Sequence, residues 1–193
     1  MLNTLRSGWA KNVQLNAGVF LLDVDYSKAT DDPTLRALIA TAMQGPDKVL
    51  GATRGDGVFR CVPERRLIEA NGARDAQKGA HVIDGWEIKL TTTLLEITPG
   101  NLVKALGCCD VKDEGKVHTL TLRSEYQDTD YIPHLLWAGD TGYGLMLIDL
   151  HNALNVSGAV LTFTDKGEGT LPVEFMAHAE GNEEPVTIKI FDK

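Results

Sequence analysis

The feature of the sequence that most constrains the fold is a long alternation of apolar and polar residues that runs directly into a short helical pattern. One parity is apolar, with Trp86, Ile88, Leu90 and Leu94, and the other is polar, with Glu87, Lys89, Thr91 and Thr93. A period of two predicts a strand with one face on a core and one polar face. Thr98 then suits a helix N-cap, Pro99 the first turn and Gly107 a left-handed C-terminal position, so we expect a helix over 98–107.

The rest of the sequence is dominated by short strand patterns. Strands are expected at 17–24, 58–62, 66–70, 117–123, 131–137, 145–150, 160–164, 171–180 and 186–190. Another helix is expected within 29–44, because Asp31 or Asp32 can cap it, Pro33 suits its first turn and apolar residues recur at helical spacing. The sequence therefore predicts a mainly β fold, a β-sandwich or barrel with one or two flanking α-helices, in one domain over 1–193.

Several segments are expected to project from this fold or to be irregular. Residues 46–80 contain several glycines and many charges, which predicts a hairpin or long loop leaving the core, with Pro63 in a turn. An acidic loop is expected at 108–116 and a connection at 151–158. Pro133 indicates that the strand at 131–137 lies at a sheet edge, where a missing N–H is tolerated.

The overall charge argues against tight nucleic-acid binding. Among 193 residues, 19 Lys and Arg face 27 Asp and Glu, a formal charge of -8. Binding to phosphates favours the opposite balance. Because no apolar run has the length of a membrane span or the form of a signal peptide, we expect a chain made and kept in the cytosol, without membrane binding.

Motifs for catalysis or metal binding are not apparent. Histidines at 81, 118, 134, 151 and 178 lack ligand spacing, and there is no P-loop and no G-x-S-x-G. Asp149 and His151 are two residues apart, as are His178 and Glu180, so the members of each pair would share a strand face. Such a pair could bind a metal or act in acid–base catalysis, although a polar strand face explains these residues more simply. Cysteines at 61, 108 and 109 are expected to be reduced structural thiols. We therefore expect no enzyme, no cofactor and no metal.

Two blocks of the sequence carry a resemblance to a known family. The first contains IDGWE, TLLEITP and LVKALG within 83–107, and the second contains YIPHLLWAGD, GLMLIDL, TDKGEGTLPVEF and EPVTIKIF within 131–191. These segments, together with a weaker match that begins with GATR at 51–54, resemble the sequences of major tail tube proteins of long-tailed, siphovirus-type bacteriophages and prophage particles. The first fifty residues carry almost none of it.

The resemblance implies a structural virion protein. Such proteins form hexameric rings that stack into the hollow tail tube, with sheets of the subunits joined into one continuous barrel around the passage for DNA ejection. It implies assembly in the bacterial host cytoplasm, a place in the virion tail, and tape-measure, tail terminator and tail tip proteins as partners, with only transient, non-specific passage of DNA. An acidic inner wall would let phosphates slide past it.

On this interpretation, particular residues are assigned to the lumen and to contacts between rings. The lumen-facing residues would be Glu87, Thr91, Thr93, Glu174 and Glu180, although Lys89 lies among them. Ring stacking would use the N-terminal segment and the excursion at 46–80, with Arg54, Arg65, Arg66 and Arg74 meeting acidic groups of the next ring.

Other functions stay open from the sequence alone. The inner-tube subunit of a contractile tail, a phage-tail-like bacteriocin or a type VI secretion device would share the fold and the ring. A β-sandwich carbohydrate-binding module would need an exposed aromatic platform, for which Trp9 is the candidate because Trp86 and Trp137 stand in apolar contexts. A small hydrolase is a third alternative.

Overall fold

The computed structural model describes residues 16–69, 71–72 and 74–192. In chain order the elements are β1 Val19–Leu22, α1 Asp32–Ala42, η2 Pro46–Lys48, β2 Val58–Leu67, β3 His81–Leu94, α2 Pro99–Leu106, β4 Cys109–Glu114, β5 Val117–Leu122, η3 Asp128–Asp130, β6 Ile132–Asp140, β7 Gly144–Asn155, β8 Leu171–Met176 and β9 Val186–Asp192. With 45% strand and 14% helix, the fold is mainly β, and two flanking α-helices are present, as predicted. Trp9 and the N-terminal segment expected at the ring contacts lie outside the described residues.

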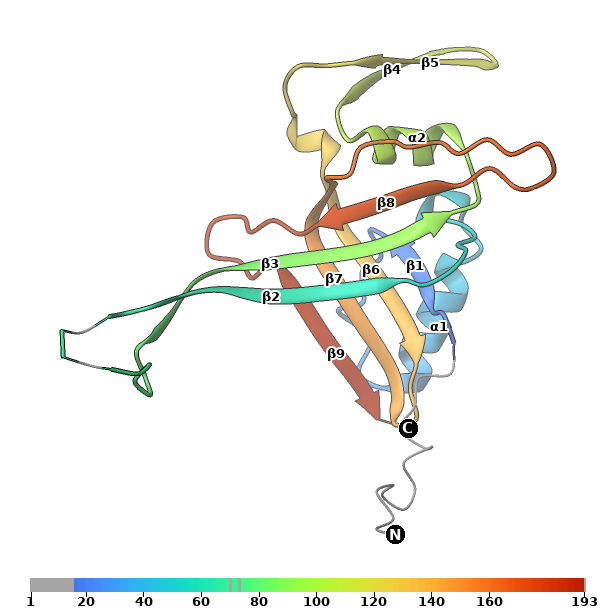
Figure 1. Cartoon of the computed structure of the whole chain (residues 1–193). Helices are drawn as coiled ribbons and strands as arrows, with labels where there is room; N and C mark the ends of the chain where they lie inside the picture. Colours follow the sequence, from blue (N-terminus) through green and yellow to red (C-terminus); the bar gives the residue numbers. More distant parts are fainter. Residues whose placement is uncertain (1–15, 70, 73, 193) are drawn as a thin grey trace.

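Seven strands form one antiparallel sheet that folds back on itself. The order is β1-β6-β7-β8-β3-β2, with β9 also pairing with β7. The first half of β7 pairs with β9, whereas Leu154 and Asn155 at its end pair with β8. Between these halves Asn152 has a positive φ of 46°, and the strand changes sheets there. Figure 1 shows β8, β3 and β2 crossing in front of β6, β7 and β9, so two crossed layers are present and no closed barrel is seen among the described strands.

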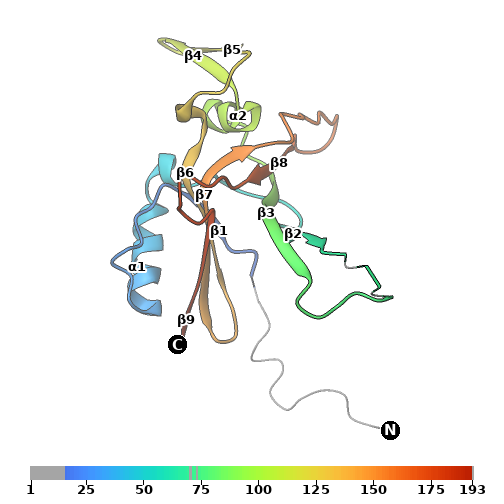
Figure 2. The same ribbon diagram turned by 90° about the vertical axis from the view of Figure 1, so that its left-hand side faces the viewer.

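Two apolar clusters hold three layers together. The inter-sheet core lies between the crossed sheets and includes Phe20, Leu90, Leu135, Trp137, Ile148 and Phe175. The helix-side core lies between α1 and the other face of the β1-β6-β7-β9 sheet and includes Leu21, Leu35, Ile39, Leu136, Leu145 and Leu147. Figure 2 shows this order, with α1 on one side of that sheet and β3 on the other. Because β6 and β7 are covered on both faces, their sequences are nearly continuous apolar runs.

Both helices begin as their sequences predict. The Asp31 carboxylate accepts a hydrogen bond from Thr34 N at 2.9 Å, and α1 follows with Pro33 in its first turn. Thr98 Oγ1 accepts from Asn101 N at 3.2 Å, and Gly107 ends α2 with φ 70°. These caps satisfy backbone groups that the first and last turns leave unpaired.

One glycine is required by close approach of two strands. Gly144 begins β7 opposite Asp192 of β9, and a Cβ at this position would lie 1.7 Å from the Phe191 carbonyl oxygen. No side chain can be accommodated at that distance, so the residue fixes how tightly β7 and β9 pair.

The expected turn at Pro63 is wrong, because Pro63 lies inside β2. This strand pairs with β3 from Val58↔Thr91 to Leu67↔His81, with a register shift between Glu64 and Arg65. A proline is tolerated there because β2 is an edge strand, paired only with β3 among the described strands. Beyond the two crossed layers this ribbon continues as a projection, which we call the arm and define as the described residues of 63–86 (Figure 1).

Four other local predictions are wrong for non-local reasons. Residues 109–114 are strand β4 rather than a loop, because they form a hairpin with β5 away from both cores. Residues 151–155 continue β7. Residues 160–164 form only an isolated bridge between Thr162 and Thr170, with Phe163 83% exposed. Finally, the strand at 131–137 was expected at a sheet edge, but β6 is an interior strand. Pro133 is tolerated because it is the second residue of β6 and precedes the residues that pair with β1.

Candidate functional surface

The polar parity of β3 lies on the outer face of the β2-β3-β8 layer, away from the inter-sheet core. Thr91 is paired with Val58 of β2 and with Glu174 of β8. Thr93 is paired with Pro172, and Glu87 with Val62. Ile88, Leu90 and Leu94, on the opposite parity, are buried in the inter-sheet core. Four of the five residues assigned to a lumen therefore share one face.

Glu180 is not brought to this face by strand pairing. It is exposed and follows the end of β8, in a connection that has left the sheet. The alternation over 171–180 suggested one long strand, but β8 ends at Met176, so parity no longer determines where Glu180 points.

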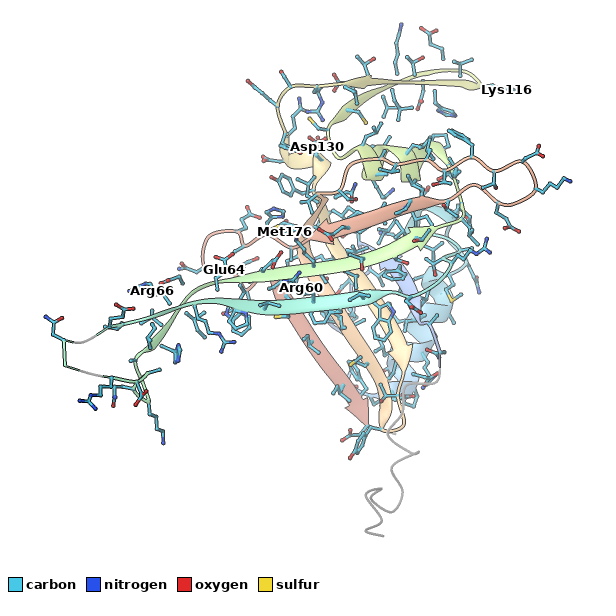
Figure 3. All side chains as sticks on the ribbon, in the orientation of Figure 1. Arg60, Glu64, Arg66, Lys116, Asp130 and Met176 are labelled. Carbon is cyan, nitrogen blue, oxygen red and sulfur yellow. The ribbon has the colours of Figure 1, made fainter. Side chains whose placement is uncertain are left out.

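The charges on this outer face are paired across the strands. Lys89 Nζ lies 2.8 Å from Glu87 Oε1 and 3.0 Å from Glu174 Oε1, and Arg60 lies 3.3 Å from the other Glu87 oxygen. Hydrogen bonding to Lys89 lowers the pKa of Glu87, and bonding first to Glu87 and then to Glu174 raises the pKa of Lys89. Figure 3 shows Arg60 and Glu64 along β2. The face is a mixed array of charges rather than the acidic inner wall that the resemblance implied.

The four arginines assigned to ring stacking lie in two places. Arg66 Nε lies 2.9 Å from Asp84 Oδ2, and this pair joins the two sides of the arm. Arg65 is exposed on the same arm, and Arg74 lies near its tip. Arg54 instead lies at the other end of the ribbon, where its backbone N–H donates to Thr93 and its side chain pairs with Glu168 at 2.8 Å.

Exposed apolar side chains on the arm were missed by sequence reasoning. Trp86 belongs to the apolar parity of β3 but is 48% exposed, and Ile83 is 54% exposed. Both side chains lie outside the two cores, because this end of β3 extends beyond the opposing sheet (Figure 1). Leu67 and Ile68 on the other side of the arm are also exposed.

A second polar cluster lies on a different face of the protein. His134, Asp149 and His151 bring one donor atom each to within 4.8 Å of one another. The Asp149–His151 pair was recognised from its spacing, whereas His134 is brought in by the pairing of β6 with β7. His178 Nδ1 instead lies 3.0 Å from the Asn152 carbonyl oxygen.

No family model matches the chain, and no curated protein matches it either. Among the described residues, no helix has both the length and the apolar character needed to cross a membrane. The surfaces described above are therefore the basis on which a function is inferred.

Proposed function

We propose that this protein is a structural subunit that self-assembles into hexameric rings and stacked rings, forming a hollow tail tube for DNA ejection. The observation that carries the proposal is the combination of exposed strand edges with a projecting arm that exposes large apolar side chains. Within the described chain, β2 pairs only with β3 and β9 pairs only with β7. Ten residues of β2 thus present one backbone edge that another chain could extend.

Edge pairing between copies would explain features that are unfavourable in a monomer. Trp86 and Ile83 expose large apolar side chains on a ribbon that lies outside both cores. Apolar side chains exposed on a projection outside the cores are candidates for protein–protein contacts. Joining the β2-β3-β8 layers of neighbouring subunits would cover the edges and make a continuous barrel.

In this arrangement the outer face of the β2-β3-β8 layer forms the inner wall. Glu87, Thr91, Thr93 and Glu174 would line the passage, with Lys89 and Arg60 neutralising part of the acidic charge. Cations held in local ion pairs offer DNA phosphates less attraction than free ones, so the wall would let DNA pass without retaining it. The tape-measure, terminator and tip proteins would bind inside and at the two ends of the tube.

The arm is assigned to contact between rings. Arg65 and Arg74 are exposed and have no ion-pair partner among the described residues, so they are available to acidic groups of a neighbouring subunit. The subunit would act in the virion tail after assembly in the host cytoplasm, and it would need no catalysis. The inner tube of a contractile tail, bacteriocin or secretion device would use the same surfaces.

A carbohydrate-binding module is less well supported by the aromatic residues. Trp137 is only 6% exposed, and Trp86 stands alone on the arm without a second tryptophan among the described residues. A sugar platform normally requires aromatic rings presented together on a rigid face.

The test is a charge reversal on the arm with a matched control elsewhere. Arg65→Glu combined with Arg74→Glu should abolish stacking, leaving rings or monomers in negative-stain images, while circular dichroism and the melting curve report a folded chain. The control is Lys112→Glu with Lys116→Glu on the exposed β4–β5 hairpin, which makes the same change in charge (Figure 3). Tubes formed equally well by both double variants would contradict the role of the arm.

A further inference from the structure

The second polar cluster occupies the face of the β1-β6-β7-β9 sheet on which α1 packs. Along β7, Leu145 and Leu147 lie in the helix-side core, and Asp149 and His151 continue the same parity past the helix. Strand pairing sets His134 of β6 opposite His151 and sets Thr187 of β9 opposite Asp149. Three neighbouring strands thus converge on one polar site at the margin of an apolar layer.

Asp149 is the centre of this site. Its side chain is completely buried, and its Oδ2 lies 2.9 Å from His134 Nδ1, 3.3 Å from His151 Nε2 and 2.9 Å from the Tyr26 hydroxyl. Its other oxygen, Oδ1, is buried and has no hydrogen-bond partner among the described residues. A buried carboxylate is costly without compensating positive charge and a full set of hydrogen-bond partners.

The donor atoms have the chemistry and spacing of a transition-metal site. Zinc binds imidazole nitrogen and carboxylate oxygen tetrahedrally at about 2.0–2.2 Å, which separates neighbouring ligand atoms by roughly 3.3–3.6 Å. The distance of 3.3 Å from Asp149 Oδ2 to His151 Nε2 matches this separation, whereas the 2.9 Å to His134 Nδ1 is a hydrogen-bond distance that would lengthen slightly when a metal binds. The two nitrogens lie within 4.8 Å of each other, and the half-exposed His134 ring has room to approach.

We propose that His134, Asp149 and His151 bind a divalent transition metal, with zinc as the best match to two imidazoles and one carboxylate. The Tyr26 hydroxyl donates to the ligand carboxylate and would orient it, as partners of metal ligands commonly do. Three protein ligands leave a fourth position for water. The metal would fasten β6 to β7 and supply the positive charge that buried Asp149 lacks.

The surroundings give a cation access to the site. A hollow open to solvent is lined by Asp23, Asp25, Tyr26, His134 and Lys189. Its two carboxylates attract a cation, whereas Lys189, whose Nζ lies 4.7 Å from the centre of the Tyr26 ring, repels one. Lys189→Gln should therefore tighten zinc binding by a few-fold, because it removes the opposing charge.

The experiment is a zinc titration of the untagged, chelator-treated full chain, followed by calorimetry and by thermal unfolding. One zinc per chain should bind, and saturating zinc should raise the melting temperature by about 5–10 °C. Cobalt in place of zinc should give a visible spectrum without a sulfur-to-metal charge-transfer band, which separates this site from the cysteines.

Matched histidine variants decide which residues bind the metal. His134→Gln and His151→Gln should each weaken zinc binding at least tenfold. His118→Gln is the control, since it removes an exposed histidine that lies 2.6 Å from a single carboxylate, Asp113, and it should leave binding unchanged. If His151→Gln does not fold, His134→Gln decides, because its side chain is half exposed. The absence of zinc binding in the wild-type chain, or equal affinity in His134→Gln, would overturn the proposal.

Discussion

Replacing Tyr26 by Phe removes one oxygen atom and tests whether the buried Asp149 carboxylate depends on its hydrogen bonds. The hydroxyl donates to Asp149 Oδ2 at 2.9 Å, while the ring packs against the helix-side core and keeps that contact in the variant. Burial, and secondly the hydrogen bond and the charge of Asp149, raise the pKa of Tyr26, so the hydroxyl remains a donor throughout the neutral range.

The size of the effect follows from the charge of the acceptor. A hydrogen bond to a charged group contributes about 1.5–3 kcal/mol to stability. The lower half of this range applies to Tyr26, because the residue is only partly buried and water can partly compensate for the lost hydroxyl. For a chain of this size each kcal/mol shifts the melting temperature by roughly 2–4 °C. Tyr26→Phe should therefore lower the melting temperature by about 3–8 °C.

Thermal unfolding followed by circular dichroism, with a chelator present, measures this difference without any contribution from metal. Tyr131→Phe is the matched control, because Tyr131 packs edge-on against His178 and its hydroxyl has no hydrogen-bond partner among the described residues. If the two variants melt within about 1 °C of each other, the hydrogen bond to Asp149 does not stabilise the fold as reasoned here.

Three further outcomes are expected. Lys89→Met should raise the pKa of Glu87 toward its ordinary value, because the ion pair that lowers this pKa is lost. The stability that the pair contributes is present above the unfolded-state pKa of Glu87 and disappears as pH falls through the lowered folded-state pKa. A carboxyl titration by NMR that shows no change in the pKa of Glu87 would refute the pairing. Asn155→Ala should cost about 2–4 kcal/mol in a urea titration, because its buried amide bonds α2, β8 and the following turn, and a loss below about 1 kcal/mol would contradict this. Gly144→Ala should prevent normal pairing of β7 with β9 and appear as poor folding on gel filtration and circular dichroism, whereas a native melting curve would show that the strands can separate locally.

Elements determined by local signals were predictable from the sequence. The alternation of β3 and the caps of α2 depend on neighbouring residues, and both are present with the expected faces and ends. The failures depend on distant parts of the chain. Residues 109–114 are too charged to look like a core strand, yet they pair with β5 because that hairpin has no core to face. Pro63 looked like a turn because nothing local shows that β2 is an edge strand.

The same division applies to the surfaces. Glu87, Thr91 and Thr93 share a face because they share a parity, and Glu174 joins them because β8 pairs with β3. Glu180 lies past the end of that strand, where parity carries no information. His134 joins Asp149 and His151 only through the pairing of β6 with β7, and fifteen positions separate it from Asp149. A single histidine fifteen residues before an Asp-x-His pair matches none of the recognised metal motifs.

Negative-stain electron microscopy of the purified wild-type chain at low and high concentration, with mass measured by light scattering, tests the proposed assembly most directly. Rings of six subunits or hollow tubes that lengthen with concentration are the predicted result. A monomer at every concentration, or a discrete dimer that binds a small molecule tightly, would contradict assembly of the purified chain into a tube.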